Sequence, residues 1–212
     1  PLTYAQRDDV ILPQYAVEEL WRQAKPLDPV ISVGVGQHQM WAAQHFGFEA
    51  PNKWLTSGGL GTMGYGFPAA IGAQMGNPDS ITICIAGDAS IQMNIQELST
   101  CLQYNLPIKI ISLNNRALGM VRQWQDMIYK GRHSHSYMDS MPDFVKLAEA
   151  YGHVGIKVDK LDELDAAMEK CFSYTDRLVF MDIAVDQNEH VYPMQVPTGS
   201  MRDMWLSKTV RT

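Results

Sequence analysis

Short apolar runs alternate along the chain with segments in which apolar residues recur at helical spacing. The runs are rich in β-branched residues, as buried strands are, and they predict strands at residues 30–36, 81–86, 108–113, 154–158 and 178–185. Helical spacing predicts helices at residues 15–25, 38–48, 65–75, 94–104, 120–129, 143–151 and 161–172. Strands that alternate with helices indicate a parallel sheet covered on both faces. We therefore expect an α/β fold, a three-layer doubly wound parallel sheet.

Charged residues are scarce in the middle of the chain. The 212 residues include 17 Lys and Arg against 23 Asp and Glu, but residues 29–108 hold only five charged side chains. Strands buried on both faces account for part of this. The net charge of −6 argues against nucleic acid as a partner. The uncharged stretch 54–78 holds seven glycines and two prolines, which argues against a membrane span. Three cysteines without metal-binding spacing favour a reducing compartment, and we expect a cytoplasmic protein.

Polar residues directly follow three of the predicted strands, at 36–38, 87–90 and 114–115. Ligands of doubly wound sheets bind at these carboxyl ends. An ionised Asp88 at the end of an apolar strand is costly unless it is paired or binds a metal. Together with Asn115 it offers the hard oxygen ligands that suit Mg²⁺. Asp88 alone would also fit a helix N-cap, and the two asparagines a turn. Both motifs at the ends of consecutive strands favour the metal site.

The spacing of these two motifs resembles a known fingerprint. Gly87-Asp88-Ala89, followed after 24 residues by Asn114-Asn115, is similar to the thiamine-diphosphate motif, with Ala89 in place of its usual third glycine. Three further segments, at 34–41, 56–64 and 119–125, resemble one branch of these enzymes. Together they are similar to the C-terminal third of the acetolactate synthase (acetohydroxyacid synthase) catalytic subunit. The resemblance covers essentially the whole chain and implies the thiamine-diphosphate-binding fold.

The resemblance assigns roles to individual positions. It implies that Asp88, the side chain of Asn115 and the backbone carbonyl of Ala117 bind Mg²⁺ together with the cofactor's diphosphate. Anions sit well on backbone N–H groups at the ends of strands and the starts of helices, which agrees with this placement. The expected cofactor-binding residues are Val35, Gly36, Gln37, His38, Gly61, Met63, Asp88, Ala89, Ser90, Asn115, Ala117, Leu118, Gly119 and Met120.

The same resemblance implies how the cofactor is activated and which side chains meet the substrate. The carbonyl of Gly61 would accept a hydrogen bond from the aminopyrimidine, and Met63 would be the apolar wedge that bends the cofactor. Met120 would line the cofactor site, and Trp124 would shape the pocket for the second substrate. The implied reaction decarboxylates pyruvate and condenses the product with pyruvate or 2-oxobutyrate, in branched-chain amino-acid biosynthesis.

Parts of the family's machinery are not recognisable in this sequence. The glutamate that activates the cofactor comes, in the family, from a partner subunit's pyrimidine-binding domain, and the FAD-binding middle domain is also missing. We therefore expect residues 1–190 to form the thiamine-diphosphate domain of a longer protein that is inactive without its other domains. Residues 191–212 would form an arm over the active site, with Thr198 near its channel. The resemblance also implies a homodimer or tetramer with the active site at the subunit interface, and a possible small regulatory subunit.

Other interpretations remain open at this stage. The segment 59–64 has the form G-x-G-x-x-G with Asp88 24 residues beyond it, as in dinucleotide-binding domains, but the strand before it would be very short. Another thiamine-diphosphate enzyme, of the pyruvate oxidase or glyoxylate carboligase type, would keep the metal motif. A non-catalytic module that only binds the cofactor is a third alternative. His133 and His135 lie in a polar segment and are expected to be solvated or to order a loop.

Overall fold

The computed structural model describes residues 2–195, 199–200 and 202–210. Its main sheet has six strands in the order β2-β1-β3-β4-β6-β5, and every neighbouring pair is parallel. This confirms the doubly wound parallel sheet. The strands are β1 (Val30–Val33), β2 (Trp54–Leu55), β3 (Thr82–Gly87), β4 (Lys109–Asn114), β5 (Val154–Val158) and β6 (Val179–Ala184).

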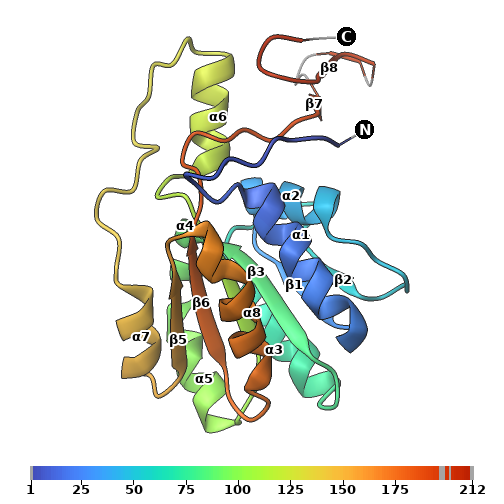
Figure 1. Ribbon diagram of the computed structural model, residues 1–212, viewed down its shortest axis with the longest axis vertical. Helices are drawn as coiled ribbons and strands as arrows, with labels where there is room; N and C mark the ends of the chain where they lie inside the picture. The colour runs from blue at the N-terminus through green and yellow to red at the C-terminus, as the bar shows by residue number, and fades with distance from the viewer. Residues whose placement is uncertain (1, 196–198, 201, 211–212) are drawn as a thin grey trace.

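Helices cover both faces of the sheet and complete the three layers (Figure 1). One hydrophobic cluster joins the sheet to α1 (Pro13–Ala24), α2 (Gln37–His45) and α8 (Leu164–Ser173). The second cluster joins the opposite face to α3 (Gly66–Gly76), α5 (Leu98–Gln103) and α7 (Phe144–Ala150). Two further helices, α4 (Asp88–Gln92) and α6 (Gly119–Met127), begin directly at or shortly after the carboxyl ends of β3 and β4.

The central strands are mostly apolar because they serve both clusters. In β3, Ile83 and Ile85 belong to the first cluster, whereas Cys84 and Ala86 belong to the second. Successive side chains of a strand point to opposite faces, so a strand covered on both sides needs apolar residues at every position. Lys109 is a buried exception in β4, and its Nζ donates to the carbonyl of Tyr174 at 2.5 Å. The scarcity of charge in this part of the chain thus follows from the layered architecture.

The helix expected at residues 94–104 is confirmed, with a first turn that is a 3₁₀ helix, η2 (Ile95–Glu97), continuing directly into α5. The sequence did not predict the separate short helix α4, which begins at Asp88 and ends at Gln92. Asn94, with φ −139°, separates α4 from η2, and its Nδ2 donates to the carbonyl of Gly64 at 2.9 Å. A tertiary hydrogen bond therefore accompanies the break between the two helices. The helix expected at 38–48 ends at His45, because the next residue is extended.

The segment after β6 crosses over the carboxyl edge of the sheet and runs beside α6 (Figure 1). Two short strands, β7 (Met194–Gln195) and β8 (Met204–Trp205), pair antiparallel there. Thr198, expected near the channel, lies outside the described residues. Among the helices that the structure describes, none combines the length and hydrophobicity required to cross a bilayer.

Candidate active site

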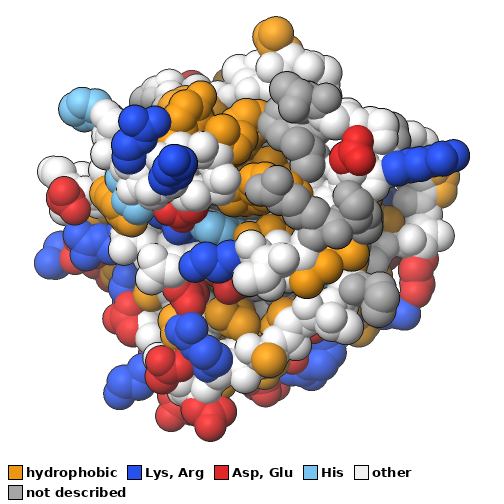
Figure 2. Space-filling view, turned by 90° about the horizontal axis from the view of Figure 1, so that it is seen from above, with side chains coloured by type: hydrophobic (Ala, Val, Ile, Leu, Met, Phe, Trp, Pro, Cys, Tyr) orange, Lys and Arg blue, Asp and Glu red, His pale blue; other side chains and the backbone are white. Residues whose placement is uncertain are grey.

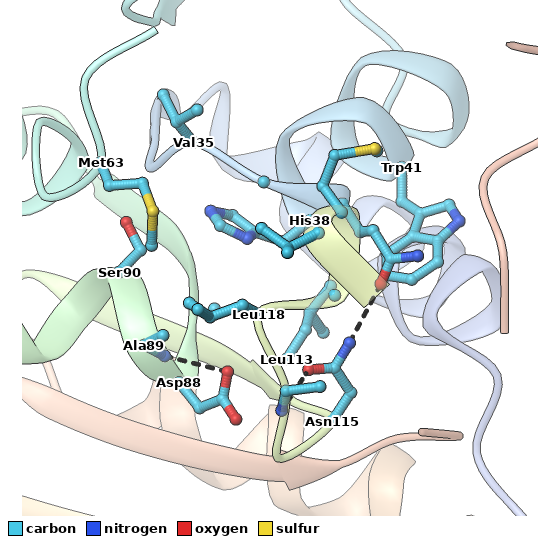
Figure 3. Close-up of a pocket in the computed structure, with 17 residues that line it drawn as sticks. Val35, His38, Trp41, Met63, Asp88, Ala89, Ser90, Leu113, Asn115 and Leu118 are labelled. Carbon is cyan, nitrogen blue, oxygen red and sulfur yellow. Dashed lines mark hydrogen bonds between the residues drawn. The ribbon is translucent and has the colours of Figure 1, made fainter. Parts of the chain in front are cut away.

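A cavity opens at the carboxyl ends of β1, β3 and β4 (Figure 3). Every residue of the expected cofactor-binding set except Gly61 lines it. The chain crosses this edge at four separate places, and the parallel arrangement of the strands brings them together. The residues of the expected set that line the cavity are Val35, Gly36, Gln37, His38, Met63, Asp88, Ala89, Ser90, Asn115, Ala117, Leu118, Gly119 and Met120. The lining residues outside that set are Trp41, Gly87, Leu113 and Val121, of which all but Leu113 lie within the quoted motifs.

Asp88 is a buried carboxyl group with one unused oxygen. It is only 1% exposed, and its Oδ1 accepts a hydrogen bond from the N–H of Ala89 at 2.9 Å. Its Oδ2 has no hydrogen-bond partner among the described residues. Burial raises the pKa of Asp88 to about 7, nearby Asp182 adds to this, and facing backbone N–H groups, including that of Ala117, oppose it. A carboxylate in this position is stabilised by a bound cation, so the chemistry of the site fits Mg²⁺.

The alternative role of Asp88 as a helix N-cap is not what the structure shows. The N-cap of α4 is Gly87, and Asp88 is the first residue inside the helix. Its side chain binds only the next N–H instead of spanning the first turn. Helix capping therefore does not explain why this carboxyl group is buried.

Asn115 and Ala117 lie in the turn that leads from β4 to α6. The Oδ1 of Asn115 accepts from the N–H of Ala117 at 3.2 Å, and its Nδ2 donates to Gln37 Oε1 at 3.1 Å. Arg116 adopts φ +53° between them, and the N–H of Leu118 donates to the carbonyl of Ser136 at 2.8 Å. Figure 3 shows Asp88 and Asn115 on the same side of the cavity. The turn is thus fixed at both ends and presents oxygen atoms beside Asp88.

The described residues contain no group of three or more His, Cys, Asp or Glu arranged to hold a metal ion. A site with a single carboxylate therefore relies on neutral oxygens and on ligands from outside the protein. Mg²⁺ is commonly bound in this way, through one or two carboxylates, water and substrate phosphates. The donor set at Asp88 fits a Mg²⁺ ion that is shared with a phosphorylated ligand.

His38 lines the cavity with a neutral imidazole ring. It is buried, its Nε2 has no hydrogen-bond partner in the described part of the chain, and burial lowers the pKa of His38 to about 4. A Cβ on Gly34 would lie 2.8 Å from this Nε2, and a Cβ on Gly87 would lie 2.7 Å from Nδ1. These two glycines therefore make room for the His38 ring. Their place in the motifs is explained by packing as well as by access to a ligand.

Gln37 uses its amide within the protein. Its Nε2 donates to Gln123 Oε1 at 2.8 Å and to the carbonyl of Glu189 at 3.1 Å, while its Oε1 accepts from Asn115. Both of its N–H groups are engaged in this arrangement. The expectation that Gln37 contacts a diphosphate stays a prediction.

The segment 57–65 reaches the cavity only at one point. Met63 lines the cavity beside Ser90, whose Oγ accepts from the N–H of Gly64 at 3.0 Å (Figure 3). Gly61 adopts φ +71° in an exposed turn and does not line the cavity. The neighbouring Leu60 is 90% exposed. The proposed contact of the Gly61 carbonyl with an aminopyrimidine therefore stays a prediction that needs a ligand reaching past Met63.

Helix α6 places two of the expected substrate residues on one face. Met120 lines the cavity, and Trp124, four residues later, is half-buried and lies outside it. Seen from above, hydrophobic side chains gather across the middle of this end of the molecule, and charged side chains are more frequent toward its rim (Figure 2).

His133 orders the segment that follows α6. Its Nε2 lies 2.5 Å from Oδ1 of Asp126, and its ring contacts Tyr137 edge-on. His135 is exposed and adopts φ +51°. Neither histidine belongs to a metal-binding group in the described residues.

Comparison with known proteins agrees with this geometry. The family model "Thiamine pyrophosphate enzyme, C-terminal TPP binding domain" matches residues 34–183. The chain is 56% identical to the acetolactate synthase isozyme 3 large subunit of Escherichia coli over its whole length, which covers 37% of that protein. It is 56% identical to the acetolactate synthase large subunit of Haemophilus influenzae, with 98% of this chain and 36% of that one aligned. It is 44% identical to acetolactate synthase 1, chloroplastic, of Nicotiana tabacum, with 96% of this chain and 31% of that protein aligned.

The chain thus spans about a third of the length of these relatives. The matched family region begins at the end of β1 and includes every residue that lines the cavity. Fold, site and comparison lead to one conclusion: the chain belongs to the thiamine pyrophosphate enzymes and carries their C-terminal TPP-binding domain.

Proposed function

We propose that this chain is the cofactor-binding part of an acetolactate synthase. The observation that carries the proposal is the Asp88 carboxyl group, which is buried at the end of β3 with one oxygen unpartnered among the described residues. Such a group is expected where a cation and a phosphorylated ligand complete the site. The relatives reported above are named acetolactate synthases, which favours this enzyme over one of the pyruvate oxidase or glyoxylate carboligase type.

Different residues of the cavity would hold the Mg²⁺ ion, the diphosphate and the rings of the cofactor. Asp88, Asn115 and the carbonyl of Ala117 would hold Mg²⁺, and the backbone at Ala89, Ser90, Leu118 and Gly119 would face the diphosphate. When bound, thiamine diphosphate supplies an electron sink for decarboxylating 2-oxo acids. Met63 would position the cofactor rings against the apolar wall, and the buried, neutral His38 would add a hydrogen-bonding ring nitrogen without adding charge.

The substrates and partners of the complete enzyme belong to the same proposal. We expect pyruvate and 2-oxobutyrate as substrates, with Met120 and Trp124 beside them, and FAD in a domain outside these residues. Val121, which lines the cavity, and Leu60, three residues before the lining Met63, are hydrophobic and exposed by 47% and 90%. This favours a partner subunit that covers the site and contributes the activating glutamate, in a homodimer or tetramer. A small regulatory subunit is a further expectation. The three free cysteines, all buried, agree with a reducing compartment such as the cytoplasm.

The proposal is tested on the full-length protein that carries these residues. Purified protein should bind thiamine diphosphate only with Mg²⁺ present and form acetolactate from pyruvate, and Asp88→Ala should abolish Mg²⁺-dependent cofactor retention. Asp79→Ala, which removes an exposed carboxylate, serves as the matched control. Unchanged retention in Asp88→Ala would refute the ligand assignment. Cofactor binding without turnover of any 2-oxo acid would instead support a non-catalytic module.

A further inference from the structure

Three buried side-chain amides form a continuous hydrogen-bonded chain from the C-terminal segment to the candidate Mg²⁺ site. At one end, Gln123 binds the backbone of Val191 twice: its Nε2 donates to the carbonyl at 3.0 Å, and its Oε1 accepts from the N–H at 2.8 Å. Gln37 Nε2 donates to the same Oε1 at 2.8 Å. Gln37 Oε1 in turn accepts from Asn115 Nδ2 at 3.1 Å. We call Gln123, Gln37 and Asn115 the amide relay.

The backbone of Val191 fixes the direction of every bond in the amide relay. A backbone N–H can only donate and a carbonyl can only accept, so Gln123 has one possible amide orientation. Its oxygen then requires the nitrogen of Gln37, and the oxygen of Gln37 requires the nitrogen of Asn115. Rotating any one amide by half a turn would place two oxygens or two nitrogens together.

Burial makes a wrong orientation costly. Gln123 and Val191 are fully buried, and Gln37 and Asn115 are 3% and 6% exposed, so water has little access to compensate for a lost partner. A buried polar group that loses its hydrogen-bond partner destabilises the fold. The relay therefore holds Asn115 in one orientation even before a ligand binds.

That orientation is the one a cation needs. With its nitrogen bound to Gln37, Asn115 directs Oδ1 to the N–H of Ala117 at 3.2 Å. Asp88 and Asn115 lie on the same side of the cavity (Figure 3). Asn115 thus presents an oxygen, not an N–H group, on the side of the cavity where Asp88 lies.

We propose that Gln123 and Gln37 are positioning residues that make Asn115 an oxygen ligand, and that the backbone at Val191 is therefore part of the Mg²⁺ site's support. This inference rests on the proposed function, because it concerns the same metal site. Residues that orient metal ligands typically change metal affinity by about 10–100-fold when they are replaced. The amide relay also links the site to the segment that leads into β7, so ligand binding and the order of that segment stabilise each other.

The first experiment titrates Mg²⁺ into the full-length protein at a fixed concentration of thiamine diphosphate and follows equilibrium binding. Gln123→Met keeps the length of the side chain but removes its polarity, and it should weaken Mg²⁺ binding by about 10–100-fold. Gln125→Met is the matched control on the same helix. Gln125 also clamps a backbone, donating to the carbonyl of Ser134 at 3.0 Å and accepting from its N–H at 3.4 Å, but it lies outside the relay.

The second experiment needs no substitution and covers the case in which Gln123→Met fails to fold. Adding Mg²⁺ and thiamine diphosphate to the unchanged protein should slow hydrogen exchange of the Val191 N–H by about 5–150-fold, the fold-change that corresponds to a coupling of about 1–3 kcal/mol. Exchange of the Ser134 N–H, which binds Gln125, should stay the same. Equal Mg²⁺ affinity in the two methionine variants, or unchanged exchange at Val191, would overturn the inference. Absence of Mg²⁺ binding by the unchanged protein would refute the proposed function itself.

Discussion

Replacing Asp88 with Asn should make the unliganded protein more stable while removing its affinity for Mg²⁺. The side chain is 1% exposed, and the substitution keeps its shape while removing its charge. Burial raises the pKa of this carboxyl group from 3.8 to about 7, so the folded state holds its proton more tightly than the unfolded state does. The charged form of Asp88 therefore destabilises the folded protein unless a bound cation offsets its charge.

The magnitude follows from the difference between the two pKa values. A shift of about 3 units at about 1.4 kcal/mol per unit corresponds to about 4 kcal/mol. The folded pKa is raised, so stability is highest below the unfolded value of 3.8, decreases as the pH rises to about 7, and is constant above it. The new amide NH2 group, whose two N–H donors lack partners, costs about 1–3 kcal/mol. Asp88→Asn should thus gain about 1–3 kcal/mol at pH 8 and little at pH 4.

Urea unfolding of the full-length protein in EDTA, at pH 4, 6 and 8, measures this gain directly. Asp79→Asn is the control, because Asp79 is exposed and should show no such pH dependence. Mg²⁺-dependent binding of thiamine diphosphate is measured on the same samples. A stability difference for Asp88→Asn that does not grow between pH 4 and 8 would show that the carboxyl group is not desolvated. Retained Mg²⁺ affinity would refute its role as a ligand.

Two further predictions concern the surroundings of the site. Gly119→Ala would place a Cβ 2.0 Å from Gln37 Oε1, so it should weaken Mg²⁺ binding about 10-fold in the titration described above. Gly72→Ala is the control, because its Cβ would meet nothing within 4 Å. This variant should bind Mg²⁺ normally and raise the melting temperature. Asp126→Asn should destabilise the protein by about 2 kcal/mol in urea unfolding at pH 7, because it leaves the buried Arg122 guanidinium without its carboxylate at 2.8 Å. Although burial favours the neutral form, hydrogen bonds from two histidines and the guanidinium hold the pKa of Asp126 below its usual range. That stabilisation is present above the ordinary pKa and is lost as the pH falls through the folded value, so an equal effect at pH 3 and pH 7 would contradict this explanation.

The sequence predicts most elements because their causes are local. Strand β3 is apolar at nearly every position, β4 carries Ile110, Ile111 and Leu113, and helix α1 has Pro13 at its start and a buried face at helical spacing. Such patterns depend on burial alone and can be recognised without knowing what covers them. The sequence missed the separate helix α4, whose break from the next helix at Asn94 is accompanied by a hydrogen bond to Gly64, 30 residues away.

The sequence by itself determined the layered parallel sheet, the edge at which the site lies, and the motifs at Asp88 and Asn115. Apolar periodicity and the position of polar residues after strands are sufficient for those conclusions. Only the tertiary structure decided that Asp88 is a buried acid with a free oxygen, that two motif glycines make room for His38, and that Gln123 is joined to Asn115. The physical reason is that desolvation and the direction of hydrogen bonds depend on which groups face each other, and these groups come from segments far apart in the chain.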